Sequence, residues 1–162
     1  MAVRLKIFVE TTVVSLLVAT RSKDTTVAVR QMHTRAWWRL RNDFELFAST
    51  GVRDESAVGD PREARKRLAV LSTMAPLEIT PAAEALAKDL LDRGKLPPRG
   101  KTDALHLGTA MVHQMDVMLS WNFKHLVNPS ILKQIYVWAS DTGYDVPVVC
   151  TPEELLRSNY EA

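Results

Sequence analysis

The sequence predicts an α/β protein: a three-layer α/β/α domain with a central, mostly parallel sheet of four to five strands. Short β-favouring runs alternate with longer helical patterns, as expected for a parallel sheet covered on both faces. A chain of 162 residues is long enough to bury one core of its own. It shows no internal repeat, low-complexity segment or domain boundary. We therefore expect a single domain over 1–162, with a short strand and helix from about residue 146.

Composition excludes several classes of protein. Hydrophobic residues at 46% and charged residues at 25% argue against disorder and against a coiled coil. A net charge of +2 gives no overall basic field, so a nucleic acid would have to be held by local patches. The single cysteine, Cys150, excludes disulfides within the chain and suits a reducing cytoplasm. Neither a membrane-spanning run nor a secretory signal is recognisable, so we expect a cytoplasmic protein without membrane contact.

The first third of the chain predicts strand, helix, helix and strand. Residues 5–9 are β-favouring, 10–12 form a polar turn, and 13–19 form a short helix. Apolar residues spaced three and four apart predict a long helix over 25–44. The run at 46–50 predicts the second strand.

The middle third repeats this alternation. Residues 51–56 open a short helix, and Asp60-Pro61 is a cap and first turn for a helix that runs through Leu71. Alternating apolar residues in 74–80 predict a third strand, and a helix over 81–92 follows. The remaining elements are expected as a loop at 93–100, a helix at 101–114, a strand at 116–120, a helix at 128–140, an edge strand at 146–150 and a capped terminal helix from 151.

Four polar residues lie where these elements meet one edge of the sheet. Glu10, Glu55 and Asn122 follow the first, second and fourth strands, and Asp103 opens a helix. Open α/β sheets place their ligands at the carboxyl ends of their strands. Three carboxylates gathered there repel one another unless a divalent cation, a nearby base or raised pKa values compensate. The cation is the simplest solution, and oxygen ligands select Mg²⁺ or Mn²⁺ over zinc.

Each of these acids has a simpler interpretation when it is considered alone. Glu10 fits a solvated turn and Asp103 fits a helix start, where the dipole favours an acid. A shift of one residue would exchange Glu55 with the adjacent Asp54, and we prefer Glu55. The common register of the acids favours a shared metal site, whose ion would activate a water and neutralise charge on phosphate oxygens.

Four short motifs follow one another on the predicted elements: Glu10-Thr11-Thr12, Ser49 with Glu55, Asp103-Ala104-Leu105-His106, and Ser120-Trp121-Asn122 with His125 and Asn128. Their order resembles the PIN-domain nucleases, most closely the bacterial branch that includes the VapC toxins of type II toxin–antitoxin modules. The resemblance spans about residues 5–129.

This resemblance implies a PIN-like fold and a Mg²⁺- or Mn²⁺-dependent ribonuclease that cleaves single-stranded RNA with a metal-activated water. It implies that the protein is the toxin of a toxin–antitoxin module, a homodimer that a cognate antitoxin protein neutralises. Carried over by position, the metal ligands are Glu10, Glu55 and Asp103, and Asn122 takes the place of a fourth acid among the catalytic residues. The residues implied to hydrogen-bond the ligands or their waters are Thr11, Thr12 and Ser120.

Two departures from the family pattern keep an alternative open. Glu10 stands where the family usually has the shorter Asp, and the neutral Asn122 stands where many members have an acid, which weakens the expectation of a second ion. The alternative is a catalytically weak PIN-like RNA-binding or scaffold module. A phosphoryl-accepting sheet protein of the response-regulator kind ranks last, because Glu78-Ile79-Thr80 does not supply the Asp that it needs.

Several side chains near these acids are candidates for contact with RNA phosphates. Arg99 and Lys101 lie in the cationic segment that leads into Asp103, although a solvated loop explains them equally well. Lys124 and His125 follow Asn122 and fit either substrate contact or a surface turn. His106 could act as a base or phosphate donor, but the interpretation we favour is a packed, hydrogen-bonded core histidine. The remaining RNA-binding predictions concern Arg93 and Lys95 in the same loop.

Overall fold

The computed structural model describes residues 3–158, and its centre is a five-stranded sheet in the order β3-β2-β1-β4-β5. All four strand pairs are parallel. The strands are β1 (Lys6–Val9), β2 (Glu45–Ser49), β3 (Ala75–Leu77), β4 (Val117–Leu119) and β5 (Val148–Cys150). The predicted fold class is therefore confirmed, with a sheet that is parallel throughout.

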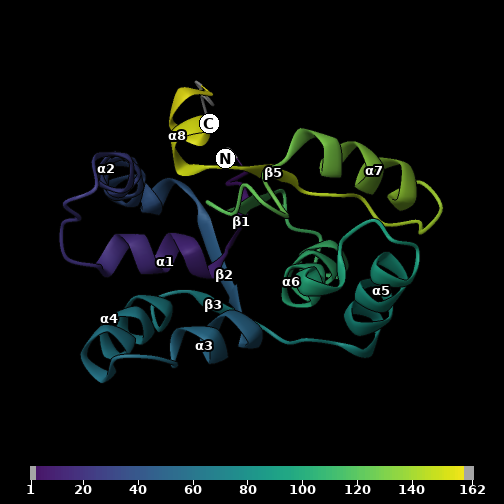
Figure 1. Cartoon of the computed structure of the whole chain (residues 1–162), viewed down its shortest axis with the longest axis horizontal. Coiled ribbons are helices and arrows are strands. Elements are labelled where there is room, and N and C mark those ends of the chain that lie inside the picture. Colours follow the sequence, from purple (N-terminus) through teal and green to yellow (C-terminus); the bar gives the residue numbers. More distant parts are fainter. Residues whose placement is uncertain (1–2, 159–162) are drawn as a thin grey trace.

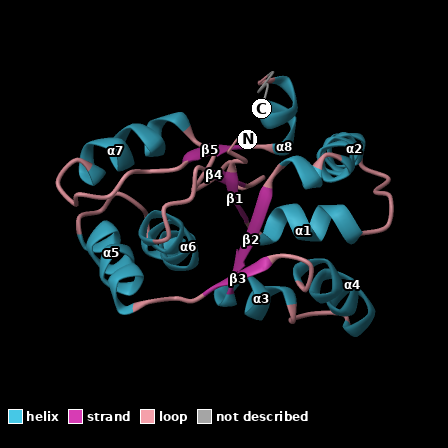
Figure 2. Cartoon of the chain, turned by 180° about the vertical axis from the view of Figure 1, so that it is seen from behind, coloured by secondary structure: helices cyan, strands magenta, loops and turns pink. Residues whose placement is uncertain are grey.

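Helices cover both faces of this sheet (Figure 1). Their bounds are α1 (Thr11–Val18), α2 (Thr25–Arg39), α3 (Thr50–Ser56), α4 (Pro61–Leu71), α5 (Pro81–Asp92), α6 (Lys101–Val112), α7 (Pro129–Ala139) and α8 (Pro152–Arg157). Helices α1, α2 and α4 lie on one side of the sheet and α5, α6 and α7 on the other, as the view from behind also shows (Figure 2). No helix in the described part of the chain is long and apolar enough to cross a membrane.

The central strand carries the core. Ile7, Phe8 and Val9 in β1 have no exposed surface, because neighbouring strands flank them and helices cover both faces. Helices α5 and α6 approach closely at Gly108, where a Cβ atom would lie 2.6 Å from the carbonyl oxygen of Ala83. Only glycine permits this contact, which seats α6 firmly beside the sheet.

Element boundaries differ from the prediction at three places. The helix predicted over 25–44 ends at Arg39, and a 3-10 turn (Arg41–Asp43) leads into extended Phe44, whose side chain is buried in the core. The third strand covers only Ala75–Leu77, an edge strand containing Pro76, which has no N–H to donate. The loop at 93–100 also ends in a 3-10 turn (Pro98–Gly100).

A fourth difference matters for the site. The polar turn predicted at 10–12 is the start of α1, because Glu10 is its N-cap and accepts a hydrogen bond from the Thr12 amide. Glu10 therefore joins the end of β1 directly to the first turn of a helix. The prediction of one domain over 1–162 includes terminal residues outside the described range and stays a prediction.

Candidate active site

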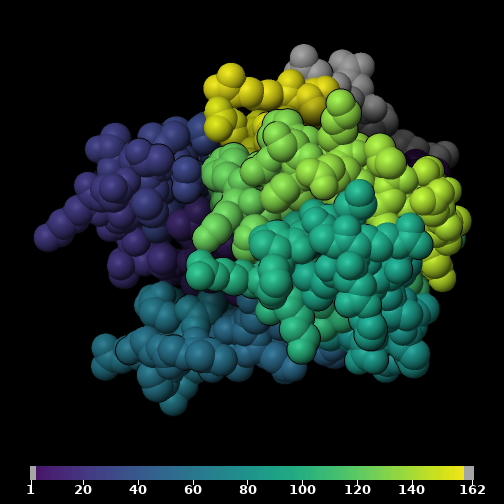
Figure 3. Space-filling view, turned by 45° about the vertical axis from the view of Figure 1, so that its right-hand side comes forward, coloured from purple at the N-terminus to yellow at the C-terminus, as the bar shows by residue number. Residues whose placement is uncertain are grey.

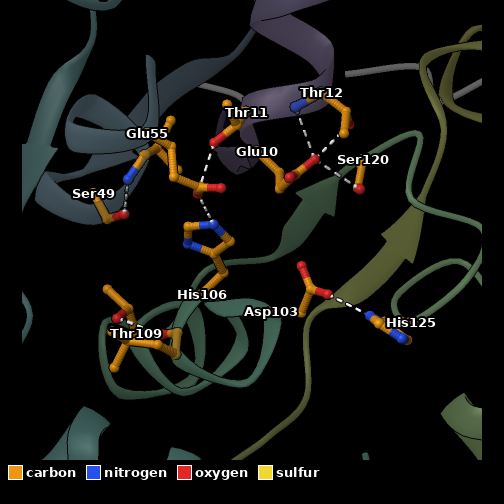
Figure 4. A network of polar contacts seen from close by, with 12 residues as sticks. Glu10, Thr11, Thr12, Ser49, Glu55, Asp103, His106, Thr109, Ser120 and His125 are labelled. Atoms are coloured by element: carbon orange, nitrogen blue, oxygen red, sulfur yellow. Dashed lines mark hydrogen bonds and ion pairs between the residues drawn. The ribbon is translucent and has the colours of Figure 1, made fainter. Parts of the chain in front are cut away.

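Glu10 is the buried centre of the site. Its side chain is 3% exposed, and its Oε2 accepts hydrogen bonds from the Thr12 amide at 3.0 Å, from the Ser120 hydroxyl at 2.9 Å and from the Thr12 hydroxyl (Figure 4). Ser120 arrives here because β4 pairs with β1. All these hydrogen bonds from the described residues go to Oε2, and their donors are neutral.

Burial raises the pKa of Glu10 above its ordinary value. Desolvation of the carboxylate is the largest effect, and it outweighs the hydrogen bonds from Thr12 and Ser120 and the attraction of His106, which all lower the pKa. The ionised form of this side chain is therefore costly without further positive charge.

Glu55 is brought to the same place by α3, which begins at the carboxyl end of β2. Ser49 caps this helix by accepting a hydrogen bond from the Val52 amide at 3.1 Å. The Glu55 carboxylate accepts a hydrogen bond from the Thr11 hydroxyl at 3.0 Å, and its Oε1 lies 2.5 Å from Nε2 of His106. Glu55 and not Asp54 contacts the site: both side chains are exposed, but Asp54 pairs with no described side chain.

The pKa of Glu55 shifts in the opposite direction from that of Glu10. Partial burial raises it, but the hydrogen bond and positive charge of His106, together with the Thr11 hydroxyl, outweigh burial and hold the pKa below its usual value. The two glutamates therefore differ in how they are stabilised. Glu10 is buried and is held by neutral donors, whereas Glu55 is partly exposed and is held by an ionisable partner, His106.

Asp103 lies in the first turn of α6 and pairs with a second histidine. Its Oδ2 is 2.7 Å from Nδ1 of His125, and its side chain is 14% exposed. Figure 4 shows this pair to the lower right of the Glu55–His106 pair, with Glu10 beside the Glu55 carboxylate. In the space-filling view the surface is recessed where the purple N-terminal segment meets the green segment (Figure 3).

Asn122 shapes the loop after β4. Its side-chain oxygen accepts hydrogen bonds from the backbone amides of Lys124 at 3.1 Å and His125 at 3.0 Å. Its backbone amide donates a hydrogen bond to Ser120 Oγ at 2.9 Å. Asn122 is therefore linked to Glu10 through Ser120, and its side-chain oxygen forms a turn. Asn side chains commonly accept a hydrogen bond from the backbone two residues further on, so the Asn itself is a signal for such a turn.

The sequence analysis named His106 and His125 as candidates, but it did not predict that they pair with Glu55 and Asp103. His106 is 2% exposed and packs against Phe8, with 5.8 Å between ring centroids. This confirms the interpretation of His106 as a packed, hydrogen-bonded group, and His125 is also buried. The cations predicted to contact RNA, Arg99, Lys101 and Lys124, are exposed.

The oxygen donors fit a hard divalent cation in their chemistry, but they are not gathered around one point. Among residues 3–158, no three His, Cys, Asp or Glu side chains are close enough to ligate a single ion. Two of the three carboxylates instead contact histidines. To share an ion, Glu55 and Asp103 would have to turn from these histidines or bind it through water, which Mg²⁺ commonly keeps.

Comparison with solved structures shows what this architecture is similar to. VapC20 from Mycobacterium tuberculosis, described as a sarcin–ricin loop cleaving toxin, matches with a TM-score of 0.58 and 16% identity over 86% of this chain and 96% of that chain. VapBC2 from Rickettsia felis, bound to a promoter DNA fragment, matches with a TM-score of 0.55 and 11% identity over 91% of this chain and 98% of that chain. FitAcB from Neisseria gonorrhoeae gives a TM-score of 0.54 and 13% identity, covering 90% and 97%.

No protein-family model matches the sequence, and no curated protein matches it either. At these identities the structural matches establish the fold. The PIN-like fold predicted from the four motifs is thereby confirmed.

Proposed function

We propose that this chain, which has the PIN-like fold of the VapC toxins, is a metal-dependent endoribonuclease and the toxin of a toxin–antitoxin module. The observation that carries the proposal is the buried Glu10 carboxylate at the end of the central strand, with Glu55 and Asp103 facing the same recess. A buried acid with a raised pKa, beside two further acids, is an arrangement that a divalent cation stabilises.

Mg²⁺ or Mn²⁺ would be held by Glu10, Glu55 and Asp103, and when bound it supplies an activated water and neutralises charge on the phosphate. The protein's own part is positioning. Thr12 and Ser120 fix one oxygen of Glu10, so this carboxylate needs no reorganisation. His106 and His125 hold the other two acids near Glu10, and these acids would turn from the histidines, or reach the ion through water, when it binds.

The proposed partners follow from the same comparison. The likeness to the VapBC2 and FitAcB structures supports a cognate antitoxin protein as a partner. Single-stranded RNA as substrate, assembly as a homodimer and a cytoplasmic location complete the proposal. The exposed Arg99, Lys101 and Lys124 supply positive charge for RNA phosphates.

One observation favours a second candidate function. Because the Asn122 oxygen already accepts two backbone hydrogen bonds, it is poorly placed to accept another from a metal-bound water. A PIN-like module that binds RNA with little or no turnover would show this feature.

The test is cleavage of mixed cellular RNA by the wild-type protein and by Asp103→Asn, each with Mn²⁺ and with EDTA. We expect cleavage only by the wild type with metal, and loss of growth inhibition in cells that express Asp103→Asn. Circular dichroism checks that the variant is folded.

Glu55→Gln and Asp54→Asn form a matched pair in the same helix. The first should lose cleavage and the second should keep it, because only Glu55 contacts the site. Full activity of Asp103→Asn, or undiminished cleavage in EDTA, would overturn the metal-dependent nuclease. RNA that is retained but never cut would favour the binding module.

A further inference from the structure

The loop at 121–125, which follows β4, is attached to the site at both ends. At its start the Trp121 amide donates a hydrogen bond to the Thr12 hydroxyl at 2.9 Å, and Thr12 in turn holds Glu10. At its end His125 contacts Asp103. Phe123, in the middle of this loop, is therefore two residues from each of the residues that attach the loop to the site.

Phe123 is unusual because it is an aromatic side chain left open at this edge. It is 43% exposed, whereas its neighbour Trp121 is 6% exposed. The two rings meet edge to face with 6.1 Å between centroids. Trp121 is itself fixed, because its Nε1 donates to the Thr34 hydroxyl of α2 at 2.9 Å. The exposed ring therefore rests on a rigid support.

Arg30, also from α2, covers part of the same ring. Its guanidinium carbon lies 4.9 Å from the centroid of Phe123 and 5.9 Å from that of Trp121. In residues 3–158 no carboxylate forms an ion pair with Arg30. The next residue along the loop, Lys124, is exposed and also has no acidic partner in this range. One cation without an acidic partner in this range thus lies over the ring of Phe123, and a second is the next residue in the chain.

We propose that Phe123, supported by Arg30, is a stacking site for a nucleobase of the RNA strand that enters the recess. This inference rests on the proposed nuclease function and adds a residue that binds the substrate outside the carboxylates. Single-stranded nucleic acids are held by aromatic rings that stack on bases and by cations that attract the phosphates. A guanidinium on the ring adds cation–π attraction and keeps the aromatic side chain in place.

A nucleobase suits this surface better than an apolar protein side chain does. The guanidinium over the ring is positive and has no acidic partner in residues 3–158, which favours a ligand that combines a flat ring with negative charge. Stacking is tolerant of sequence because every base has a π-face. Phe123 should therefore raise affinity for single-stranded RNA in general and contribute little to the choice of cleavage site.

The experiment measures binding of two labelled probes by fluorescence anisotropy in EDTA, so that metal-dependent cleavage does not interfere. One probe is a short single-stranded oligouridylate, and the other is an abasic ribose-phosphate strand of the same length. Phe123→Ala should bind the oligouridylate about 5- to 150-fold more weakly than the wild type, the range expected for loss of one stacked base. Its affinity for the abasic strand should not change.

Four further variants separate stacking from charge and from general disruption. Phe123→Trp should keep the affinity, whereas Phe123→Leu, which preserves bulk without the π-face, should lose it. Arg30→Gln should weaken binding of both probes, because it removes a charge. Tyr136→Ala is the matched control, since Tyr136 is an aromatic residue of α7 with a comparable exposed fraction of 49%. It should bind both probes as the wild type does.

Equal affinity of the wild type and Phe123→Ala for the oligouridylate would overturn the inference and would instead favour a protein partner on this ring. An equal loss for both probes would also overturn it, since the effect would then not depend on the base. Both results leave the nuclease proposal standing, because metal-dependent cleavage by the wild type is measured separately.

Discussion

The amino and carboxyl edges of the parallel sheet both carry acidic side chains, but these acids differ in burial and in what holds them. At the amino edge a cavity of about 590 Å³ is lined by Lys6, Asp116, Asp145 and their neighbours. Asp116 there is exposed, and its carboxylate accepts a hydrogen bond from the Lys6 backbone amide at 2.8 Å. At the carboxyl edge Glu10 is almost fully buried and is held by side chains. The hollow at the amino edge carries an acid that accepts a backbone hydrogen bond, whereas the carboxyl edge carries an acid whose ionised form is costly to bury.

Strand direction explains the difference. Helices α1, α3 and α6 begin at the carboxyl edge, and their N-terminal turns favour negative charge. Helices end at the amino edge, and helix C-termini do not favour negative charge. A buried acid near helix N-termini is therefore a better guide to function in this fold than a hollow in the surface is.

The largest expected effect separates the two edges directly. Glu10→Gln should reduce RNA cleavage by more than about 100-fold, because loss of a ligand should exceed the 10- to 100-fold cost typical of groups that only orient ligands. Asp116→Asn keeps a hydrogen-bond acceptor at the amino edge and should cleave as the wild type does. Initial rates on one RNA substrate measure both variants. Similar losses in the two variants would show that the edges are not functionally distinct.

Metal binding should stabilise the folded protein, and this stabilisation should depend on residues of the carboxyl edge and not on those of the amino edge. At a concentration 100 times its Kd, Mn²⁺ should add about 2.7 kcal/mol to the free energy of unfolding of the wild type. Asp116→Asn should gain the same stabilisation, and Glu10→Gln should gain much less. Thermal unfolding with and without Mn²⁺ measures this independently of RNA. An unchanged melting temperature in the wild type at saturating Mn²⁺ would count against a metal at this edge.

A smaller effect concerns the groups that hold Glu10. Ser120→Ala removes the donor to Glu10 and the acceptor for the Asn122 amide, so activity should fall about 10- to 100-fold. Ser56→Ala is the control, because Ser56 is equally buried and its hydroxyl has no hydrogen-bond partner among residues 3–158. Cleavage rates compare the two variants. Equal activities would mean that fixing Glu10 contributes nothing.

The smallest expected effect concerns Cys150, a residue at the same edge that is buried but has no proposed role in the site. Cys150 ends β5, and burial raises the pKa of its thiol to about 12 from an ordinary value of 9.0. Above pH 9 the unfolded thiol loses its proton while the folded one keeps it, so this group makes stability fall as pH rises toward 12. The slope is at most about 1.4 kcal/mol per pH unit.

Cys150→Ala lacks this titration, so its urea-unfolding free energy should decline less steeply than that of the wild type between pH 9 and pH 11. Parallel declines would show that the thiol ionises as easily in the folded protein as in the unfolded chain. RNA cleavage at neutral pH should be the same in both proteins, because the neutral thiol takes no part in the site.

Much of the architecture was predictable because strand and helix periods differ. The alternation placed Glu10, Glu55 and Asp103 at the ends or starts of elements, and parallel pairing then brings such positions to one edge. The end of α2 was not predictable from apolar spacing. Phe44 continues the helical period, but it enters the core from extended backbone after a 3-10 turn.

The two histidine–carboxylate pairs show more clearly what could not be predicted from the sequence. A spacing of three residues suggested that His106 accompanies Asp103 on α6, yet each turns to a different partner. His106 meets Glu55, 51 residues away, and Asp103 meets His125, 22 residues away. Such contacts depend on the distances between packed elements, which residue spacing within one helix does not contain. The metal ligands themselves remain a prediction.

The central position of β1 has a consequence for protein synthesis. Glu10 leaves the ribosome well before Ser120, which lies 110 residues further along the chain. A nascent chain therefore carries the site's carboxylates without an assembled site until β4 has emerged and paired with β1. On the proposed function, the ribosome and messenger that produce this nuclease are exposed to its activity only after β4 has emerged.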